Sequence, residues 1–119
     1  NGLGSGNEFV EDITLPAGFS GVCFINVSYN LKDNVKNLDV SPTLNNIIFD
    51  SWLAGIEKNV FLVRGNKIES FYVDKERLVI GDIGSCDKGD GSSYLCCNVK
   101  DGKIELRFTG LGKKVKVSG

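Results

Sequence analysis

Four cysteines are the residues of this 119-residue chain whose types and spacing most clearly suggest chemistry: Cys23, Cys86, and the adjacent Cys96 and Cys97. Neighbouring residues on a strand point to opposite faces, so Cys96 and Cys97 cannot easily share one role. A zinc site with four thiolates needs two pairs of cysteines separated by a few residues, and the sequence has no such pairs. It also has no histidine, the usual partner of a catalytic cysteine or serine. Two disulfide bonds are therefore predicted, with buried reduced thiols in a cytosolic protein as the alternative.

The pairing of these cysteines is suggested by the faces on which they fall. Cys97 belongs to an apolar set on its strand and Cys96 to a more polar one, so Cys97 is expected in the core and Cys96 on the outer face or at an edge. The pairing that fits best is Cys23–Cys97 through the core and Cys86–Cys96 across a glycine-rich loop. Four cysteines allow three connectivities, and sequence alone does not choose among them. A bond between Cys96 and Cys97 is sterically poor, which makes its connectivity the least favoured.

The acidic residues form no pattern that indicates a reaction or a metal. Asp82, Asp87 and Asp90 lie in and beside "DKGDGSS", which lacks the spacing and the distal glutamate of a calcium loop. A solvated turn is the better interpretation. Carboxylate pairs such as Asp50 with Glu57, or Asp82 with Asp90, have no spacing that recommends hydrolysis. We therefore predict no catalytic residue, no metal and no cofactor.

Export from the cell is the expectation that joins the remaining signals. Asn26 begins the sequon Asn26-Val27-Ser28 and is a candidate for glycosylation. The net charge of −1 provides nothing to attract nucleic acid or an anionic membrane surface. The chain begins at Asn1 and contains no methionine, so a signal or an anchor is expected to have preceded it. Any membrane attachment would then depend on that missing N-terminal anchor, and the predicted location is extracellular or the cell surface.

Many short strands are predicted from frequent glycine and asparagine turns and from alternating apolar residues. Residues 1–8 are expected to be a flexible lead-in, and residues 9–119 a single domain. Residues Val22 to Val27 are predicted to form a strand buried on both faces, because they are apolar at nearly every position through Ile25. Turns are predicted at "LPAG", at Gly65-Asn66 and at Asp101-Gly102, the last joining two strands of a β-hairpin. Seven to nine strands at this spacing predict a mainly β fold, an antiparallel β-sandwich or roll. Its core is expected to contain Cys23, Phe61, Leu95, Val99, Ile104, Leu106 and Phe108.

One short helix is predicted after residue 41. Ser41 is a suitable N-cap, Pro42 occupies the favoured first position, and Gly55 can end the helix. Apolar residues recur at helical spacing from Leu44 to Trp52. The run of three apolar residues at positions 47–49 keeps a strand as the alternative. Trp52 is expected to pack in the core rather than form an exposed contact site.

Two stretches, "FVEDITLPAGFSGVCFINVS" and "YLCCNVKDGKIELRFTGLGKKVKV", resemble the extracellular β-domains of archaeal pilin-like and membrane-anchored secreted proteins. The resemblance implies a small β-domain that follows an N-terminal hydrophobic helix. It transfers no functional residue, since such domains have no catalytic motif to match.

A non-catalytic binding domain is therefore the leading hypothesis, either a pilin-like subunit or an anchored surface or adhesion module. The domain would then function by binding protein partners or by self-assembly. The loops at 29–41 and 82–93 are the expected contact elements, because connections tolerate variation on a rigid scaffold. The surface candidates in them are Lys32, Asp33, Asp82, Asp87 and Asp90. The competing hypotheses are a small secreted ligand-binding protein and, less favoured, a hydrolase.

Overall fold

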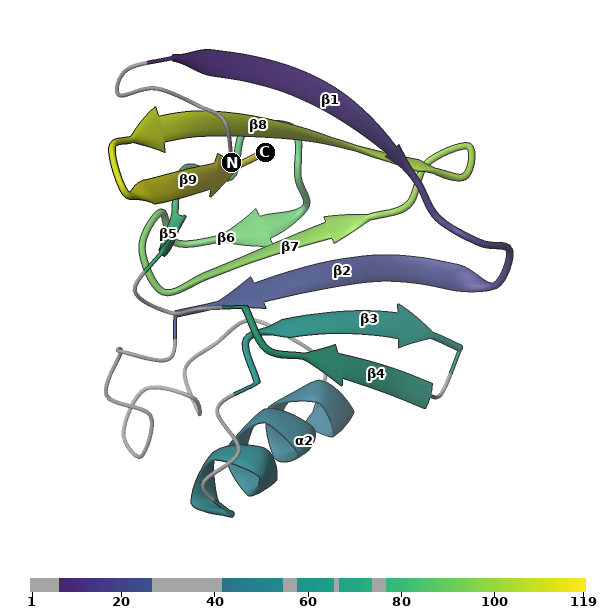
Figure 1. Ribbon diagram of the computed structural model, residues 1–119. Helices are drawn as coiled ribbons and strands as arrows, with labels where there is room; N and C mark the ends of the chain where they lie inside the picture. The colour runs from purple at the N-terminus through teal and green to yellow at the C-terminus, as the bar shows by residue number, and fades with distance from the viewer. Residues whose placement is uncertain (1–6, 27–41, 55–57, 66, 74–76) are drawn as a thin grey trace.

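Two β-sheets and a helix form three layers in the computed structural model, which describes residues 7–26, 42–54, 58–65, 67–73 and 77–119 (Figure 1). The four-stranded sheet contains, in order, β1 (Glu8–Thr14), β8 (Lys103–Leu111), β9 (Lys114–Ser118) and β5 (Leu78–Ile80). The five-stranded sheet contains β4 (Lys67–Phe71), β3 (Val60–Arg64), β2 (Phe19–Ile25), β7 (Tyr94–Asn98) and β6 (Lys88–Gly89). The helix is α2 (Pro42–Leu53). The mainly β fold with nine strands in the described residues confirms the predicted class.

Strand β2 is central to the five-stranded sheet and explains why its sequence is apolar at nearly every position. It pairs with β3 on one side and with β7 on the other. Val22 packs on the core between the two sheets, whereas Cys23 and Ile25 pack on the core beneath α2. A strand covered on both faces needs apolar residues on both, which is the pattern that predicted it.

The apolar interior is divided into two cores by the five-stranded sheet. The core between the sheets contains Val22, Ile80, Leu95, Cys97, Ile104, Leu106 and Val117. The core between this sheet and α2 contains Cys23, Ile25, Leu44, Ile48, Phe61, Tyr94 and Cys96. Of the predicted core residues, Phe108 and Val99 are only partly buried and the other five are buried. The seven residues were predicted to share one core, but they are divided between two because α2 covers the second face of the five-stranded sheet.

The helix prediction is confirmed over Pro42–Leu53, and the strand alternative is wrong. Leu44 and Ile48, one turn apart, are buried against the sheet, and Ile47 and Phe49 are partly buried beside them. This apolar stripe packs α2 against the sheet, where it also contacts the core residues of β3 and β4. The predicted N-cap Ser41, the terminator Gly55 and the side chain of Trp52 lie outside the described residues.

The predicted hairpin at Asp101-Gly102 is wrong, although its turn forms. Both turn residues have positive φ, 53° and 75°, and Lys100 and Lys103 exchange two backbone hydrogen bonds of 2.9 and 3.0 Å. Beyond this single bridge the strands separate, because β7 pairs with β2 and β6 while β8 pairs with β1 and β9. Their apolar residues therefore face each other across the interior of the sandwich rather than lying side by side.

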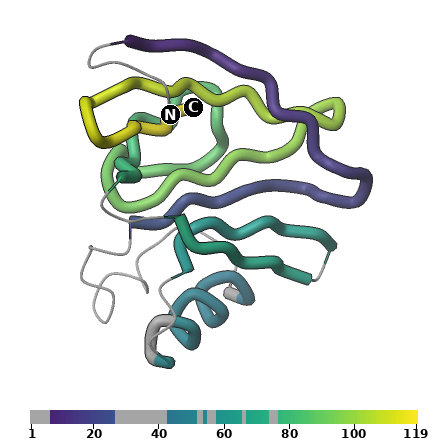
Figure 2. The backbone as a smooth tube through the Cα atoms, viewed as in Figure 1, coloured from purple at the N-terminus to yellow at the C-terminus, as the bar shows by residue number. Residues whose placement is uncertain are grey.

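The connection from β1 to β2 crosses between the sheets in the same way, at the same end of the sandwich (Figure 2). The "LPAG" turn forms as predicted, with a hydrogen bond from Phe19 N–H to Pro16 O. Two further backbone hydrogen bonds join the crossings, Leu15 N–H to Gly102 O at 3.0 Å and Val99 N–H to Ser20 O at 2.8 Å. This end of the sandwich is consequently closed by backbone pairing.

Smaller differences concern the four-stranded sheet. Glu8, which the sequence analysis assigned to the lead-in, is the first residue of β1. Strand β5 runs parallel to β9, so the sheet is not wholly antiparallel.

Candidate interaction surface

The disulfides connect Cys23 with Cys96 and Cys86 with Cys97, so the predicted pairing is wrong. The register of β2 and β7 places Cys23 opposite Cys96, with Cα atoms 4.1 Å apart, and Val22 opposite Cys97. Opposed residues of an antiparallel pair share a face, which fixes the first bond on the face beneath α2. Cys97 points to the other core, where Cys86 meets it.

Cys96 is buried beneath the helix on a strand with neighbours on both sides, so the expectation that it lies on an outer face or at an edge is wrong. The polar appearance of its neighbours was misleading, because Tyr94 on the same face is also buried there. The tandem cysteines thus cross-link both faces of one strand. Two disulfides in a domain of this size are compatible with an extracellular location.

The loop between β5 and β7, where three candidate residues lie, is held to the sheet at several points. Its short strand β6 pairs with β7 beside the Cys86–Cys97 bond. Asp87 donates its N–H to Cys96 O, and its carboxylate accepts the N–H of Asn98 at 2.6 Å. The carbonyl of Asp82 accepts the N–H of Gly119. These contacts make the loop a rigid part of the scaffold.

Asp90 organises the turn that leads into β7. Its Oδ1 accepts the N–H groups of Ser92 at 3.0 Å, Ser93 at 2.7 Å and Tyr94 at 3.3 Å, and Oδ2 accepts the Ser93 hydroxyl. Burial is the largest single influence and raises the pKa of Asp90, but the Ser93 hydroxyl and these N–H groups together hold its pKa below the ordinary value. The carboxylate of Asp90 therefore accepts hydrogen bonds from the turn in which it lies.

We expect Asp90 to stabilise the fold at neutral pH and to lose that effect in acid. A carboxyl whose pKa is lower in the folded than in the unfolded state contributes stability above the unfolded value of about 4, and loses it as the pH falls through the folded value. The free energy of unfolding of the wild type should therefore exceed that of Asp90→Asn at pH 7, and the difference should shrink below about pH 4. Urea denaturation at both pH values measures this. A constant difference would contradict the assigned role.

The other predicted site residues are not brought together in the part of the chain that the structure describes. Asn26 is partly buried and donates its amide to Ser92 O at 3.3 Å, and its glycosylation stays a prediction. Asp50 is exposed on α2. Lys32, Asp33, Glu57 and Ser28 lie outside the described residues. Among those described, no three Asp, Glu, Cys or His side chains gather where they could hold a metal.

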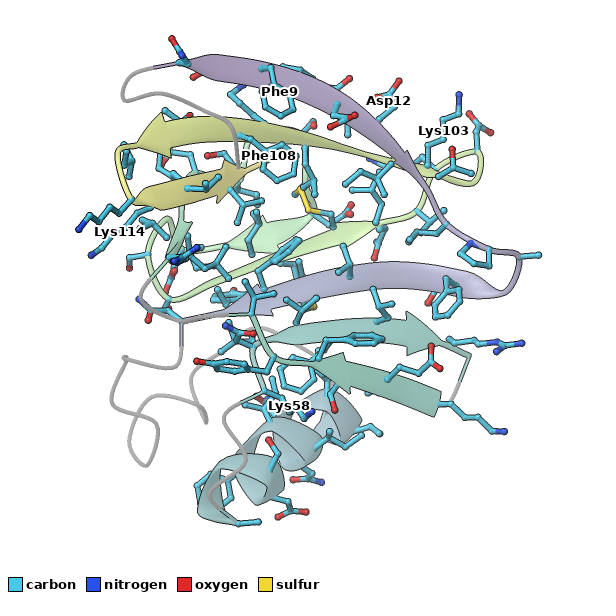
Figure 3. All side chains as sticks on the ribbon, viewed as in Figure 1. Phe9, Asp12, Lys58, Lys103, Phe108 and Lys114 are labelled. Atoms are coloured by element: carbon cyan, nitrogen blue, oxygen red, sulfur yellow. A yellow bond between two sulfur atoms is a disulfide. The ribbon has the colours of Figure 1, made fainter. Side chains whose placement is uncertain are left out.

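A cleft of about 450 Å³ opens where β7 crosses to β8. Its lining contains the Cys86–Cys97 disulfide together with charges of both signs, Asp12, Lys100, Asp101, Lys103 and Glu105. Asp12 and Lys103 project near this end of the four-stranded sheet (Figure 3). Asp12 and Glu105 are directly opposed on β1 and β8 and are exposed. A second cleft of about 250 Å³ lies beside Cys23–Cys96.

Exposed apolar side chains gather in two places that the sequence analysis missed. On β1, Phe9 is 42% exposed, and its ring lies 5.5 Å from that of Phe108 on the interior side of the sheet (Figure 3). At the end of β4, the consecutive residues Phe71, Tyr72 and Val73 are 48, 53 and 42% exposed. A sequence signal existed for the second group, since three apolar residues in succession break the alternation expected of a half-buried strand.

Asn59 holds this second group in an extended conformation, although β4 itself ends at Phe71. Asn59 is 1% exposed, and its backbone N–H donates to Phe71 O at 3.0 Å. Its side-chain amide then makes two bonds to Val73, donating to the carbonyl at 2.6 Å and accepting the N–H at 2.7 Å. The buried amide thus replaces a neighbouring strand and extends the ordered edge by two residues.

Comparisons with known proteins give no family for this chain: no family model, curated protein or solved structure matches it. Within the described residues, no helix has the length and hydrophobicity needed to cross a membrane.

Proposed function

We propose that this protein is a non-catalytic extracellular domain that works by binding or assembly, as a pilin-like subunit or a membrane-anchored surface module. The observation that carries this proposal is the exposed segment Phe71–Val73, three large apolar side chains held in place by a buried amide. Exposed apolar groups cost solubility, and rigid ones are typical of surfaces that bind another protein.

The disulfides support the extracellular part of the proposal. Each closes on a buried strand, and small secreted domains use such bonds to supplement a limited core. The carboxylates of the 82–93 loop support the non-catalytic part, because those of Asp87 and Asp90 bind backbone N–H groups of their own scaffold. Their contribution is to shape the surface.

Cells that produce the protein provide the test. Protease added to intact cells should degrade it, and alkylation before lysis should find no free thiol. A reduced protein that is protected until lysis would contradict the proposal. Retention of the protein with cells after washing would favour the anchored form, and its presence in the medium would favour a free one.

A secreted ligand-binding protein is the second candidate, and the 450 Å³ cleft favours it. Its mixed charges fit a small zwitterionic ligand better than an apolar one. The double substitution Asp12→Asn and Glu105→Gln should abolish such binding while leaving the fold intact, since both side chains are exposed.

A further inference from the structure

The four edges of the two sheets differ in how far they are protected against strand pairing. Strands β5 and β6, at two of the edges, have only three and two residues. Strand β1 exposes Phe9 and Val10 as well, but the exposed charges Glu8, Glu11 and Asp12 flank them on both sides. Strand β4 begins with exposed Lys67 and Glu69 but continues into Phe71–Val73. Short strands and charges blunt an edge, so the second half of the β4 edge is the least protected in the described structure.

The backbone of this segment presents hydrogen-bonding groups to the open edge. Asn59 engages the carbonyl of Phe71 and both backbone groups of Val73. Along an extended chain, alternate residues direct their N–H and C=O groups to opposite sides. The groups of Ser70 and Tyr72 therefore point away from β3, toward an incoming strand.

The side chains of β4 present a different chemistry on each face. Lys67, Glu69 and Phe71 lie opposite Arg64, Leu62 and Val60 of β3, on the face toward the core between the sheets. Ile68 packs on the opposite face, against the core beneath α2. Val73 follows the first set by alternation. An antiparallel partner strand, read from its N-terminus, would lie opposite the apolar Val73 and Phe71, then the acidic Glu69, then the basic Lys67.

We propose that the edge formed by β4, Tyr72 and Val73 binds an extended segment of a partner polypeptide as an additional antiparallel strand. The segment has apolar residues opposite Val73 and Phe71, a basic residue opposite Glu69 and an acidic residue opposite Lys67. Backbone hydrogen bonds to Ser70 and Tyr72 supply affinity, and the side chains supply register. This inference rests on the proposed binding function and names its surface and the chemistry of its partner.

A heptapeptide tests the proposal directly: Ac-Val-Thr-Val-Thr-Lys-Thr-Glu-NH2, titrated into the oxidised protein and followed by amide chemical shifts. The expected result is saturable shifts centred on Ser70 and Tyr72. N-methylation of the peptide residues opposite Tyr72 and Ser70 should weaken binding by about tenfold or more, because it removes two backbone hydrogen bonds. N-methylation of the peptide residues opposite Phe71 and Glu69 should have little effect. Exchanging the lysine and the glutamate should weaken binding about fivefold.

Matched variants locate the site on the protein. Phe71→Ser with Tyr72→Ser should abolish the peptide shifts, whereas Phe9→Ser, which removes a similarly exposed aromatic ring on β1, should leave them unchanged. Shifts centred elsewhere, or equal effects of the two methylation patterns, would overturn the proposal. So would a concentration-dependent dimer that Ser70→Pro disrupts, because the occupant would then be a second copy. A surface-exposed, oxidised protein that ignores the peptide would refute this docking site alone, and a reduced cytosolic protein would refute the proposed function.

Discussion

Removal of the Cys23–Cys96 bond, by replacing both cysteines with alanine, is expected to lower the free energy of unfolding by about 4 kcal/mol. The bond joins residues 73 apart in sequence and therefore restricts the unfolded chain strongly. The Cys86–Cys97 bond, with a separation of 11, should contribute about 3 kcal/mol. Domains are typically stable by about 5–15 kcal/mol, so loss of both bonds should remove about half of that stability or more. Urea denaturation of the two double variants measures which disulfide contributes more to the free energy of unfolding.

Thiol titration of the same variants in denaturant tests the connectivity. The variant without Cys23 and Cys96 should have no free thiol, because Cys86 and Cys97 remain bonded. A variant that instead lacks Cys23 and Cys97 should have two, because Cys86 and Cys96 lie on different faces of the sheet. The opposite result would restore the pairing inferred from the sequence.

Replacement of Phe61 with alanine is expected to cost about 3–5 kcal/mol. Phe61 is fully buried on β3, in the core that joins the five-stranded sheet to α2. Removing its ring should leave a cavity beneath α2, next to Cys23, which is opposite Phe61 on β2. Denaturation with urea gives the change, and loss of helical signal before loss of sheet signal would show that α2 detaches first.

Phe71→Ala is the control for this substitution, because Phe71 lies on the neighbouring strand and is 48% exposed. Its cost should be below about 1 kcal/mol, in keeping with substitutions at the surface. Similar costs at Phe61 and Phe71 would contradict the two-core description. A small cost at Phe71 also means that an effect of its substitution on peptide binding would not reflect unfolding.

Local patterns predicted most elements, because each pattern was decided by neighbours in sequence. The first-turn proline and the apolar stripe of residues 42–52 predicted a helix, and these residues form α2. The central strand β2 was recognisable because burial on both faces leaves few polar positions. Strands β3 and β4 pair with each other, as the predicted turn between them required, and Gly65 has a positive φ of 57°. The second residue of that turn, Asn66, lies outside the described residues.

Relations between distant segments could not be predicted in the same way. The Asp101-Gly102 turn has the same local geometry whether its strands pair or cross to different sheets, and that choice depends on which strands flank them. The disulfide pairing failed for a related reason. One position of register between β2 and β7 decides whether Cys96 or Cys97 faces Cys23, and the sequence contains no marker of that register.

The candidate surface was missed because its determinants are separated in the chain. Tyr72 and Val73 are ordinary apolar residues until Asn59, 14 residues before Val73, fixes them at an open edge. The loop residues Asp87 and Asp90 were attractive as exposed acids, but each is committed to backbone groups nearby. A polar side chain is available for binding only if it has no hydrogen-bond partner within its own fold. Composition does not reveal those partners.

The cross-link between β2 and β7 also determines how the domain responds to mechanical load. A force applied at the two ends of the chain passes from Cys23 directly to Cys96 through the disulfide. The segment between these cysteines, which are 73 positions apart in sequence, therefore carries no tension. Helix α2 and the β3–β4 hairpin lie within that segment, so we expect them to stay folded while the outer strands detach. Stretching by single-molecule force spectroscopy should therefore release only the residues outside the bond, and reduction should restore the full contour length. The β4 edge would remain available for binding in a chain under tension.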